Sequence, residues 1–383
     1  MIIAEGRKVD VVAAACTAQA VLSLCHANPM PARIMLRVLL LLGFAAGARA
    51  EILKPRVVVV TMFEQGADTG DKPGELQYWV EREHLDRVIP VPAAFHPVRA
   101  NADGTVIAIV TGGGNTNAAA TLMALGLDSQ FDLRQSYWLV AGIAGIDPAD
   151  GSIGSAVWAD YVVDGDLAHE IDAREIPAGW PTGYVPLGKI TPYQQPPLPQ
   201  DYAAGQFYAL DPGLVRWAFA LTRDTPLVDN EQMKKRRETY TDSPAAMRPP
   251  SVSIGANLAA STYWHGRLLN HWANDWVAYY TNGRANYVTT AMEDSGTLRS
   301  LTNLQRAGKV DARRVLVLRT ASNYDMQWPG GSASDSMSGE SLGIYSAYLP
   351  SLEAAYRVGS RVVHALVAGW DRFATTLPQA AQP

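Results

Sequence analysis

Cysteine is almost absent from this 383-residue sequence, which contains only Cys16 and Cys25. Two thiols are too few for the disulfide framework of a small secreted domain or for a cysteine-based zinc module. An excess of basic charge is also missing, because 32 lysines and arginines stand against 37 aspartates and glutamates. The resulting net charge of −5 argues against a protein that binds nucleic acid by neutralising phosphates. A mean hydropathy of −0.04 argues against repeated membrane spans, each of which needs about 20 consecutive apolar residues.

The sequence does contain enough apolar residues to build a large core. Hydrophobic residues make up 48% and charged residues 18%, which is typical of a folded globular chain and not of a disordered one. The length exceeds the usual range of about 100–200 residues for one domain. It suits either one large α/β domain or two smaller domains.

The first fifty residues have the pattern of a leader. Basic residues precede an apolar run over residues 38–47, and Ala48-Arg49-Ala50 closes the run with small residues at the two positions that a signal peptidase reads. The run is too short to span a bilayer. We therefore predict a signal peptide over residues 30–50, cleavage after Ala50, and a periplasmic or secreted protein. A buried N-terminal helix is the alternative.

The residues before the signal peptide need a separate interpretation. A compact signal would begin at Met30 or Met35, so residues 1–29 are interpreted as an over-long gene model. Cleavage would leave residues 51–383 as the mature chain, without either cysteine. A chain without thiols suits an oxidising periplasm, because it cannot form wrong disulfides.

Apolar strands alternate with helical segments along the mature chain. Runs such as Arg56–Thr61 and Arg314–Arg319 are apolar on both faces, as in parallel sheets. We predict a single large three-layer α/β domain with a mixed, mostly parallel sheet flanked by helices. The proline-rich segment 173–199 lacks periodicity and predicts a long ordered loop or lid. The predicted strands are 56–61, 105–110, 137–141, 156–163, 251–254, 286–290 and 314–319, and the predicted helices are 118–126, 211–222, 230–240, 262–280, 293–306 and 341–370.

A glycine-rich turn joins the second predicted strand to the helix after it. Its backbone N–H groups, at Gly113, Asn115 and the residues beside them, could bind an anion or a ribosyl oxygen at the helix start. The turn is not a G-x-G-x-x-G motif, because Asn117 occupies the last position, and it lacks the lysine of a Walker loop. A tight turn without a ligand is the alternative.

Two later strand ends carry polar side chains. Met292-Glu293 lies where a strand becomes a helix, and open α/β sheets bind their ligands at such places. A carboxylate there can accept hydrogen bonds from a ribose diol, with the methionine sulfur packed beneath the sugar. The alternative is that Glu293 only caps its helix. The last predicted strand ends in Thr320-Ala321-Ser322-Asn323 and brings a short amide to the same edge.

Together these motifs resemble the nucleoside phosphorylase and nucleosidase superfamily, and most closely its purine nucleoside permease branch. The resemblance extends over about residues 56–370. Met292-Glu293 is similar to the ribose-binding Met-Glu of the superfamily. The stretch Leu139–Pro148 is nearly identical to one in the permease branch. The resemblance implies a nucleoside phosphorylase-like fold.

The resemblance also implies roles for individual residues. Glu64, in a methionine-bearing turn, would activate water, Glu293 would hold the ribose hydroxyls, and Asn323 would stabilise charge on the leaving base. The predicted loop at 142–145 would border the purine, and Trp264 would stack on it. The candidates for substrate binding are Gly113, Asn115, Asn117, Ala144, Gly145, Trp264, Met292, Glu293 and Ser322.

Some positions depart from the superfamily pattern. Asn323 replaces the aspartate that many members use as a general acid. An amide can bind N7 and a 6-oxo group but cannot deliver a proton, which favours guanosine or inosine. Ala291 replaces a second ribose-binding glutamate of some phosphorylases, and the glycine turn lacks a phosphate-binding arginine.

The resemblance implies cleavage of the N-glycosidic bond of a purine nucleoside by phosphate or water. It implies no metal and no organic cofactor, and phosphate is a candidate co-substrate. The first alternative is a nucleoside-binding component of transport without catalysis, as the word permease suggests. The second is a storage or carrier protein that has lost the site.

Two expectations concern partners. No stable membrane insertion is expected after signal cleavage, since residues 51–383 have no apolar run near about 18 residues. A homo-oligomer is one expectation, because superfamily members commonly form dimers, trimers or hexamers. The aromatic residues of the predicted helix 262–280 could line such a contact or belong to the buried core.

Overall fold

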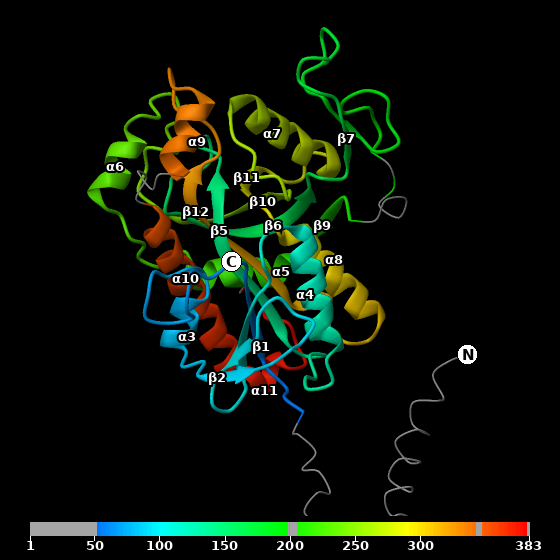
Figure 1. The fold of residues 1–383 in the computed structure, drawn as a ribbon, viewed down its shortest axis with the longest axis vertical. Helices are drawn as coiled ribbons and strands as arrows, with labels where there is room; N and C mark the ends of the chain where they lie inside the picture. Colours follow the sequence, from blue (N-terminus) through cyan, green and yellow to red (C-terminus); the bar gives the residue numbers. More distant parts are fainter. Residues whose placement is uncertain (1–51, 198, 200–204, 342–346, 381–383) are drawn as a thin grey trace, which may run out of the picture. The chain divides into compact units, whose positions relative to one another are not determined.

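The computed structural model of the protein describes residues 52–380 apart from 198, 200–204 and 342–346 (Figure 1). The predicted signal peptide and both cysteines lie outside the described residues. Ile52–Pro383 forms one compact unit. Within the described part of the chain, no helix combines the length and the apolar composition that a membrane span requires.

Strands and helices alternate along this unit. The strands are β1 (Val57–Thr61), β2 (Arg87–Ile89), β3 (Val98–Ala100), β4 (Val106–Val110), β5 (Tyr137–Ile146), β6 (Ala156–Asp164), β7 (Ala168–Glu170), β8 (Tyr184–Pro186), β9 (Phe207–Ala209), β10 (Val252–Ala259), β11 (Tyr287–Ala291) and β12 (Val315–Tyr324). The helices are α3 (Gln77–Arg82), α4 (Asn115–Leu127), α5 (Pro212–Thr222), α6 (Glu231–Arg237), α7 (Arg267–Thr281), α8 (Asp294–Arg306), the 3₁₀ helix η1 (Ala312–Arg314), α9 (Ala333–Ser341), α10 (Tyr348–Ala368) and α11 (Trp370–Phe373).

The main sheet is mixed and mostly parallel. Its order is β11-β10-β6-β12-β5-β1-β4-β3-β2, with β9 paired to β6. Strands β4, β1, β5 and β12 run parallel to one another, and so do β6, β10 and β11. The two groups meet where β12 pairs antiparallel with β6. In Figure 1, α3 and α10 lie on one side of the central strands and α4 and α8 on the other. The predicted α/β class, a largely parallel sheet flanked by helices, is confirmed.

One further pairing closes part of this sheet. Gly145 and Ile146 at the end of β5 pair antiparallel with Thr290 and Thr289 of β11. Strands β5, β12, β6, β10 and β11 therefore form a closed ring. Closure removes the free edge that β11 would otherwise expose. It also brings Glu293, two residues after β11, close to the end of β5.

The core contains one cluster that is mainly aromatic. It packs around α7, and we call it the aromatic cluster: Trp264, Trp272, Trp276, Tyr279, Tyr280 and Tyr287. The indole of Trp276 is fully buried and donates to the Asp164 carbonyl at 2.9 Å. The two tryptophans on α7 are therefore part of the core of this chain.

Some predicted boundaries were wrong, for identifiable reasons. Residues 142–145, predicted as a loop, continue β5 because they pair with β12 as far as Tyr324. The predicted helix 262–280 begins only at Arg267, because Gly266 has φ +123°, which is not helical. The predicted helix at 341–370 corresponds to α10, which begins at Tyr348 and carries a proline in its first turn, where proline is tolerated.

The remaining differences concern strands. The strand predicted at 251–254 extends to Ala259, since it pairs with β6 and β11 on both sides. The proline-rich segment 173–199, predicted without strands, contains β8, which pairs with β7 in a small second sheet. Its other described residues are turns and loops.

Candidate functional site

The second half of β5 is the common support of the polar residues that gather at one edge of the sheet. The N–H of Ile143 donates to Glu75 Oε1 at 2.7 Å, and the carbonyl of Ile143 accepts from Arg319 Nη1 at 3.1 Å. One residue further on, the Ala144 carbonyl accepts from Ser322 Oγ at 3.2 Å. A segment predicted as a loop thus holds three residues from two other parts of the chain, the loop before α3 and strand β12.

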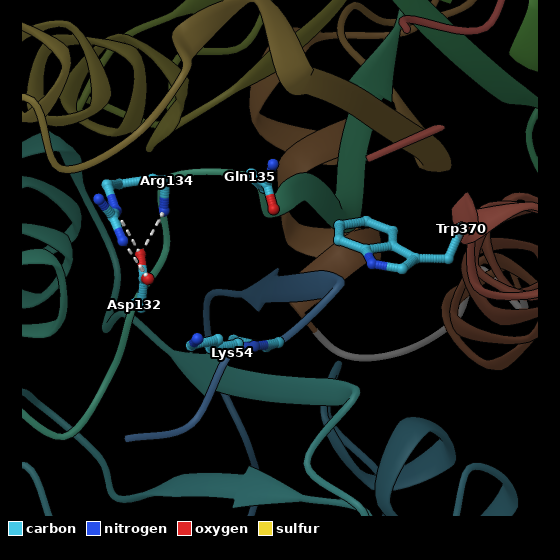
Figure 2. Close-up of a pocket in the computed structure, with 6 residues that line it drawn as sticks. Lys54, Asp132, Arg134, Gln135 and Trp370 are labelled. Carbon is cyan, nitrogen blue, oxygen red and sulfur yellow. Dashed lines mark hydrogen bonds and ion pairs between the residues drawn. The ribbon is translucent and has the colours of Figure 1, made fainter. Parts of the chain in front are cut away.

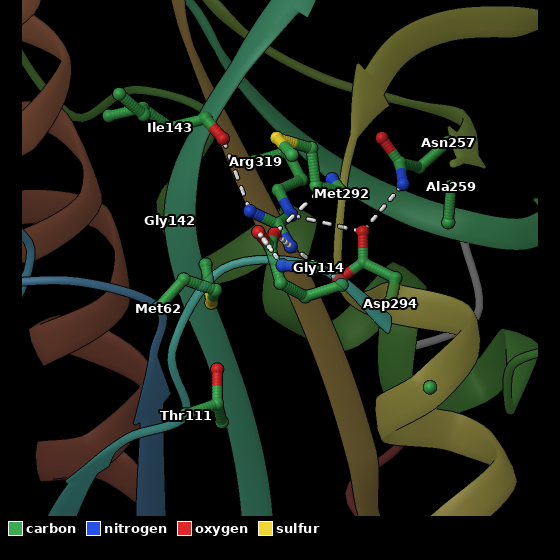
Figure 3. Close-up of polar contacts among 12 residues, drawn as sticks. Met62, Thr111, Gly114, Gly142, Ile143, Asn257, Ala259, Met292, Asp294 and Arg319 are labelled. Carbon is green, nitrogen blue, oxygen red and sulfur yellow. Dashed lines mark hydrogen bonds and ion pairs between the residues drawn. The ribbon is translucent and has the colours of Figure 1, made fainter. Parts of the chain in front are cut away.

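Arg319 is a buried cation within the apolar strand β12. Its side chain is 1% exposed and forms a bidentate pair with Asp294, with Nε–Oδ2 at 3.0 Å and Nη2–Oδ1 at 2.7 Å (Figure 3). Nη2 also reaches Glu293 Oε2 at 3.2 Å. Burial lowers the pKa of Arg319, but the charges of Asp294 and Glu293 more than offset this and hold it above its ordinary value. Such pairing is required, because an unpaired buried charge costs several kcal/mol.

Glu293 connects this ion pair to the glycine turn. Its Oε1 accepts the Gly114 N–H at 3.1 Å, and its Oε2 accepts the Met292 N–H at 3.2 Å. Although Glu293 is the residue before α8, its side chain makes no capping bond to that helix. The residue is 6% exposed. Burial raises the pKa of Glu293, and Arg319 together with the Gly114 N–H offsets this only in part.

The glycine turn is docked on the start of α8. Asn115 Oδ1 accepts the Gly296 N–H at 2.9 Å, while Asn115 Nδ2 donates to Asp166 Oδ2 at 2.9 Å. A side chain at position 296 would overlap the backbone of Asn115, so only glycine allows this approach. Gly113 and Asn117 are exposed, and Asn117 Nδ2 donates to the Gly113 carbonyl at 2.8 Å. The structure therefore brings the predicted turn and the predicted Met292-Glu293 motif together.

Glu75 is a site residue that the sequence analysis missed. Besides the Ile143 N–H, its carboxyl group accepts the Met62 N–H at 2.7 Å. Burial raises the pKa of Glu75 to about 8, with Arg319 opposing the shift and Glu293 adding to it. A carboxyl group with this pKa carries a proton over much of the neutral range.

Gly142 makes the convergence of these side chains possible. A Cβ at this position would lie 2.7 Å from both Arg319 Nη1 and Glu75 Oε1, and would overlap Met62 Cε. Since β5 passes between these three side chains, they can approach only a residue without a side chain.

Glu64, predicted as a catalytic residue, lies in the loop that follows β1. Its Oε1 accepts the N–H groups of Gln65, at 2.8 Å, and Gly74. Its Oε2 accepts those of Leu76 at 3.0 Å and Gln77 at 2.6 Å. Glu64 therefore fixes the loop that positions Glu75.

The last predicted motif lies against the end of β5, as expected. Asn323 is opposite Gly145 in the sheet register, and a Cβ on Gly145 would lie 3.2 Å from Asn323 Nδ2. Asn323 Oδ1 accepts from Ser322 Oγ at 2.8 Å, and Asn323 Nδ2 donates to the Tyr324 carbonyl at 3.0 Å. Ser322, Asn323, Ala144 and Gly145 thus form one group.

Trp264 was predicted to lie on a helix, but it lies in the segment between β10 and α7. Its ring packs edge-on to Trp272 at 5.9 Å and lies 6.3 Å from the ring of Tyr287. Tyr287 in turn donates to Asp325 Oδ2 at 2.5 Å, two residues after Asn323. The stacking of Trp264 on a purine stays a prediction.

Two of the missed residues had a sequence signal. Arg319 follows four apolar residues in a strand, and a charge there is nearly always paired when it is buried. Asp294 directly follows the predicted ribose-binding glutamate. Glu75 had no such signal, because it lies in an irregular polar stretch between Glu64 and α3.

A separate cavity of about 360 Å³ lies at the amino ends of β1 and β5 (Figure 2). Its charged residues include Asp132 and Arg134, which pair with each other at 2.6 Å. The complete lining is Lys54, Pro55, Asp132, Arg134, Gln135 and Trp370. Open α/β sheets bind their ligands at the carboxyl ends of strands. The group around Glu293 lies at the opposite edge of the sheet and is the candidate functional site.

The fold is that of an α/β protein with a buried, charge-paired group of side chains at the strand ends of a mixed sheet. The chain belongs to the purine nucleoside permease family, whose model matches residues 54–378. This match confirms the resemblance that the sequence motifs indicated.

Relatives in two fungi support this assignment. The chain is 30% identical over 292 residues to a probable purine nucleoside permease of Schizosaccharomyces pombe, covering 72% of this chain and 80% of the relative. It is also 30% identical over 325 residues to a purine nucleoside permease of Candida albicans, covering 84% and 77%.

Solved structures are more distantly similar. A 5′-methylthioadenosine/S-adenosylhomocysteine nucleosidase of Helicobacter pylori matches with a TM-score of 0.47 and 13% identity, covering 82% of this chain and 99% of that one. A futalosine hydrolase of the same organism matches with a TM-score of 0.47 and 14% identity, covering 82% and 98%.

Proposed function

We propose that this protein binds purine nucleosides and cleaves their N-glycosidic bond, with phosphate or water as the nucleophile. The observation that carries the proposal is the placement of Glu293, a buried carboxylate held by Gly114 and Arg319 where β11 meets α8. In a member of the purine nucleoside permease family, this carboxylate suits the two hydroxyls of a ribose.

The geometry supports a division of roles around the sugar. Glu293 accepts hydrogen bonds from the 2′- and 3′-hydroxyls, and Met292 packs beneath the ring. Cleavage creates positive charge on the ribosyl group and negative charge on the leaving base. Glu293 stabilises the first, and the amide of Asn323 donates a hydrogen bond toward the second. The nucleophile enters from the exposed side of the glycine turn, at Gly113.

Glu75 suits the handling of the nucleophile's proton better than Glu64 does. Both oxygens of Glu64 accept two backbone N–H groups each, so this carboxylate is fully engaged in holding its loop. Glu75 is buried beside Arg319 and has a pKa of about 8. A base with a pKa near the working pH is the most effective proton acceptor in such a step.

The predicted signal peptide supports an extracytoplasmic location for this activity. Cleavage after Ala50 would release a chain that begins one residue before the compact unit at Ile52. The substrates would then be nucleosides of the periplasm or of the surroundings of the cell.

Product analysis tests the proposal. Purified protein is incubated with guanosine, inosine or adenosine, with and without phosphate, and free base is measured. Release that requires phosphate indicates a phosphorylase, and release without phosphate indicates a hydrolase. Nucleoside binding in calorimetry without any free base would overturn cleavage. It would support the second candidate, a binding component of transport, which the names of the fungal relatives favour. If the protein neither binds nucleosides nor releases free base, it is a carrier that has lost the site.

The pH profile should identify the proton-accepting residue. If ionised Glu75 accepts the proton, kcat/KM should rise as the pH passes through about 8, because the group is protonated below this value. The charged groups that face it are Arg319 and Glu293, and Tyr348 of α10 lies close enough to be affected by its charge. Glu75→Gln should remove this rise and lower kcat by roughly 10²–10⁴-fold.

Glu64→Gln is the matched control for this experiment. It weakens the loop that carries Glu75 but leaves the titrating group in place, so the rise near pH 8 should persist. If the rise disappears in Glu64→Gln and persists in Glu75→Gln, the two roles are the reverse of those proposed.

A further inference from the structure

Behind Glu293 lies a buried line of polar side chains that crosses three strands. Thr289 Oγ1 donates to Asn257 Oδ1 at 3.0 Å, and Asn257 Nδ2 donates to Asp294 Oδ2 at 2.5 Å. Asp294 then forms the bidentate pair with Arg319 (Figure 3). All four side chains are almost completely buried.

The bond lengths show how Arg319 is shared. Asp294 receives two bonds from the guanidinium, at 2.7 and 3.0 Å, whereas Glu293 receives one at 3.2 Å. One cation thus faces two carboxylates, and the three groups carry a net charge of −1 when both are ionised. Without the charge of Asp294, Arg319 would be free to form the bidentate pair with Glu293 that Arg and carboxylates prefer.

Asn257 donates to Asp294 Oδ2, the same oxygen that accepts from Arg319 Nε. Its amide oxygen is occupied by the hydroxyl of Thr289, so its NH₂ group points to Asp294. An amide donor stabilises an ionised carboxylate, and the opposite orientation would place two oxygens against each other. The line therefore holds the Asp294 carboxylate in place against the guanidinium of Arg319.

We infer that Asp294, supported by Asn257, is a positioning residue that keeps Arg319 from neutralising Glu293. The inference rests on the proposed function, in which Glu293 binds the ribose hydroxyls. The remaining negative charge of the group then lies on Glu293, facing the sugar. There it strengthens the bonds to the hydroxyls and stabilises the positive charge that develops on the ribosyl group.

The test compares binding of a purine nucleoside with binding of its 2′,3′-dideoxy counterpart by calorimetry. The ratio of the two affinities reports how strongly Glu293 binds the ribose hydroxyls. It does not require turnover, so the inference remains testable if the protein binds nucleosides without cleaving them. Asp294→Asn should reduce this ratio by about tenfold or more, the effect of one charge-assisted hydrogen bond. If the protein also cleaves nucleosides, kcat should fall more than KM rises.

Two further variants separate charge from structure. Asp147→Asn also removes a buried carboxylate that accepts from an asparagine amide, at 2.8 Å from Asn274, and should keep the ratio. The double variant Asp294→Asn with Arg319→Met removes both charges. Its affinity ratio should lie between that of Asp294→Asn and that of the wild-type protein. An unchanged ratio in Asp294→Asn, or no recovery in the double variant, would overturn the inference. A wild-type protein that binds both ligands equally would instead reject the role of Glu293, and the inference with it.

Discussion

Replacing Glu293 with glutamine should reduce nucleoside turnover by roughly a hundredfold or more, because a buried polar site loses its charge at the place where positive charge develops. The amide introduced by Glu293→Gln would keep one oxygen for the Gly114 N–H. Its NH₂ group, however, would face Arg319 and the Met292 N–H, where the native oxygen accepts hydrogen bonds. Both the hydrogen bonds to the ribose hydroxyls and the stabilisation of the positive charge on the ribosyl group are then weakened. Steady-state kinetics together with calorimetric binding measures the two losses separately.

Glu231→Gln is a matched control for this variant. Glu231 is also at the start of a helix, but it is exposed and its contact is a surface pair with Lys234 at 2.7 Å. Its replacement should leave turnover unchanged, since exposed pairs of this kind contribute little. Unchanged kinetics in Glu293→Gln would reject the assignment of Glu293 to the ribose.

Replacing Arg319 with methionine should lower the free energy of unfolding by about 3–5 kcal/mol at neutral pH, because removal of one partner leaves buried charge uncompensated. Asp294 would lose its bidentate partner, and Glu293 and Glu75 would lose their nearest cation. Urea denaturation followed by tryptophan fluorescence measures the loss.

The decrease in the free energy of unfolding caused by Arg319→Met should be larger at neutral pH than at acid pH. Arg319 lowers the pKa values of Glu75 and Glu293, which burial raises, so without this cation both folded-state values rise further above their unfolded values. A raised carboxyl pKa gives stability that is complete below the unfolded value and is lost as the pH rises through the folded value. The deficit relative to wild type should therefore shrink toward acid pH. In wild type, Glu75 alone should cause stability to fall between about pH 4.5 and about pH 8.

Arg237→Met provides the comparison for this stability series. Arg237 is also buried and bidentate, but its partner Asp229 is partly exposed, at 21%. Water can solvate the charge of Asp229 when Arg237 is removed. The free energy of unfolding should therefore fall less in Arg237→Met than in Arg319→Met, and the decrease should change less with pH. An equal decrease in the free energy of unfolding in both variants would show that burial of the carboxyl groups around Arg319 does not increase the cost of removing their cation.

The sequence predicted the edge at which the site lies better than it predicted the residues that complete it. The apolar runs that became β1 and β12 indicated a parallel sheet, and the carboxyl ends of parallel strands share one edge. For that reason the glycine turn and Met292-Glu293 could be expected to lie close together. Their contact, from Gly114 to Glu293, spans 179 residues of sequence.

The position of Glu75 could not be predicted from local patterns. It lies in a loop without periodicity, and the loop takes its shape from the four backbone N–H groups that bind Glu64. Residues 142–145 were misassigned for a related reason. Glycine and alanine have low strand propensity, and pairing with the distant strand β12 overrides this preference.

Gly142 has a consequence for how the chain reaches its native state. The side chains that converge on it, Met62, Glu75 and Arg319, come from both ends of the folded unit, and Arg319 bonds to Ile143 across 176 residues. Contacts between such distant segments form slowly, because long loops must close before any interaction compensates for the lost entropy. The site is therefore assembled only after β12 has been added, the last strand of the main sheet in chain order. A chain released before Arg319 would contain the ribose-binding glutamate and the glycine turn, but not the cation that allows Glu293, Asp294 and Glu75 to be buried together.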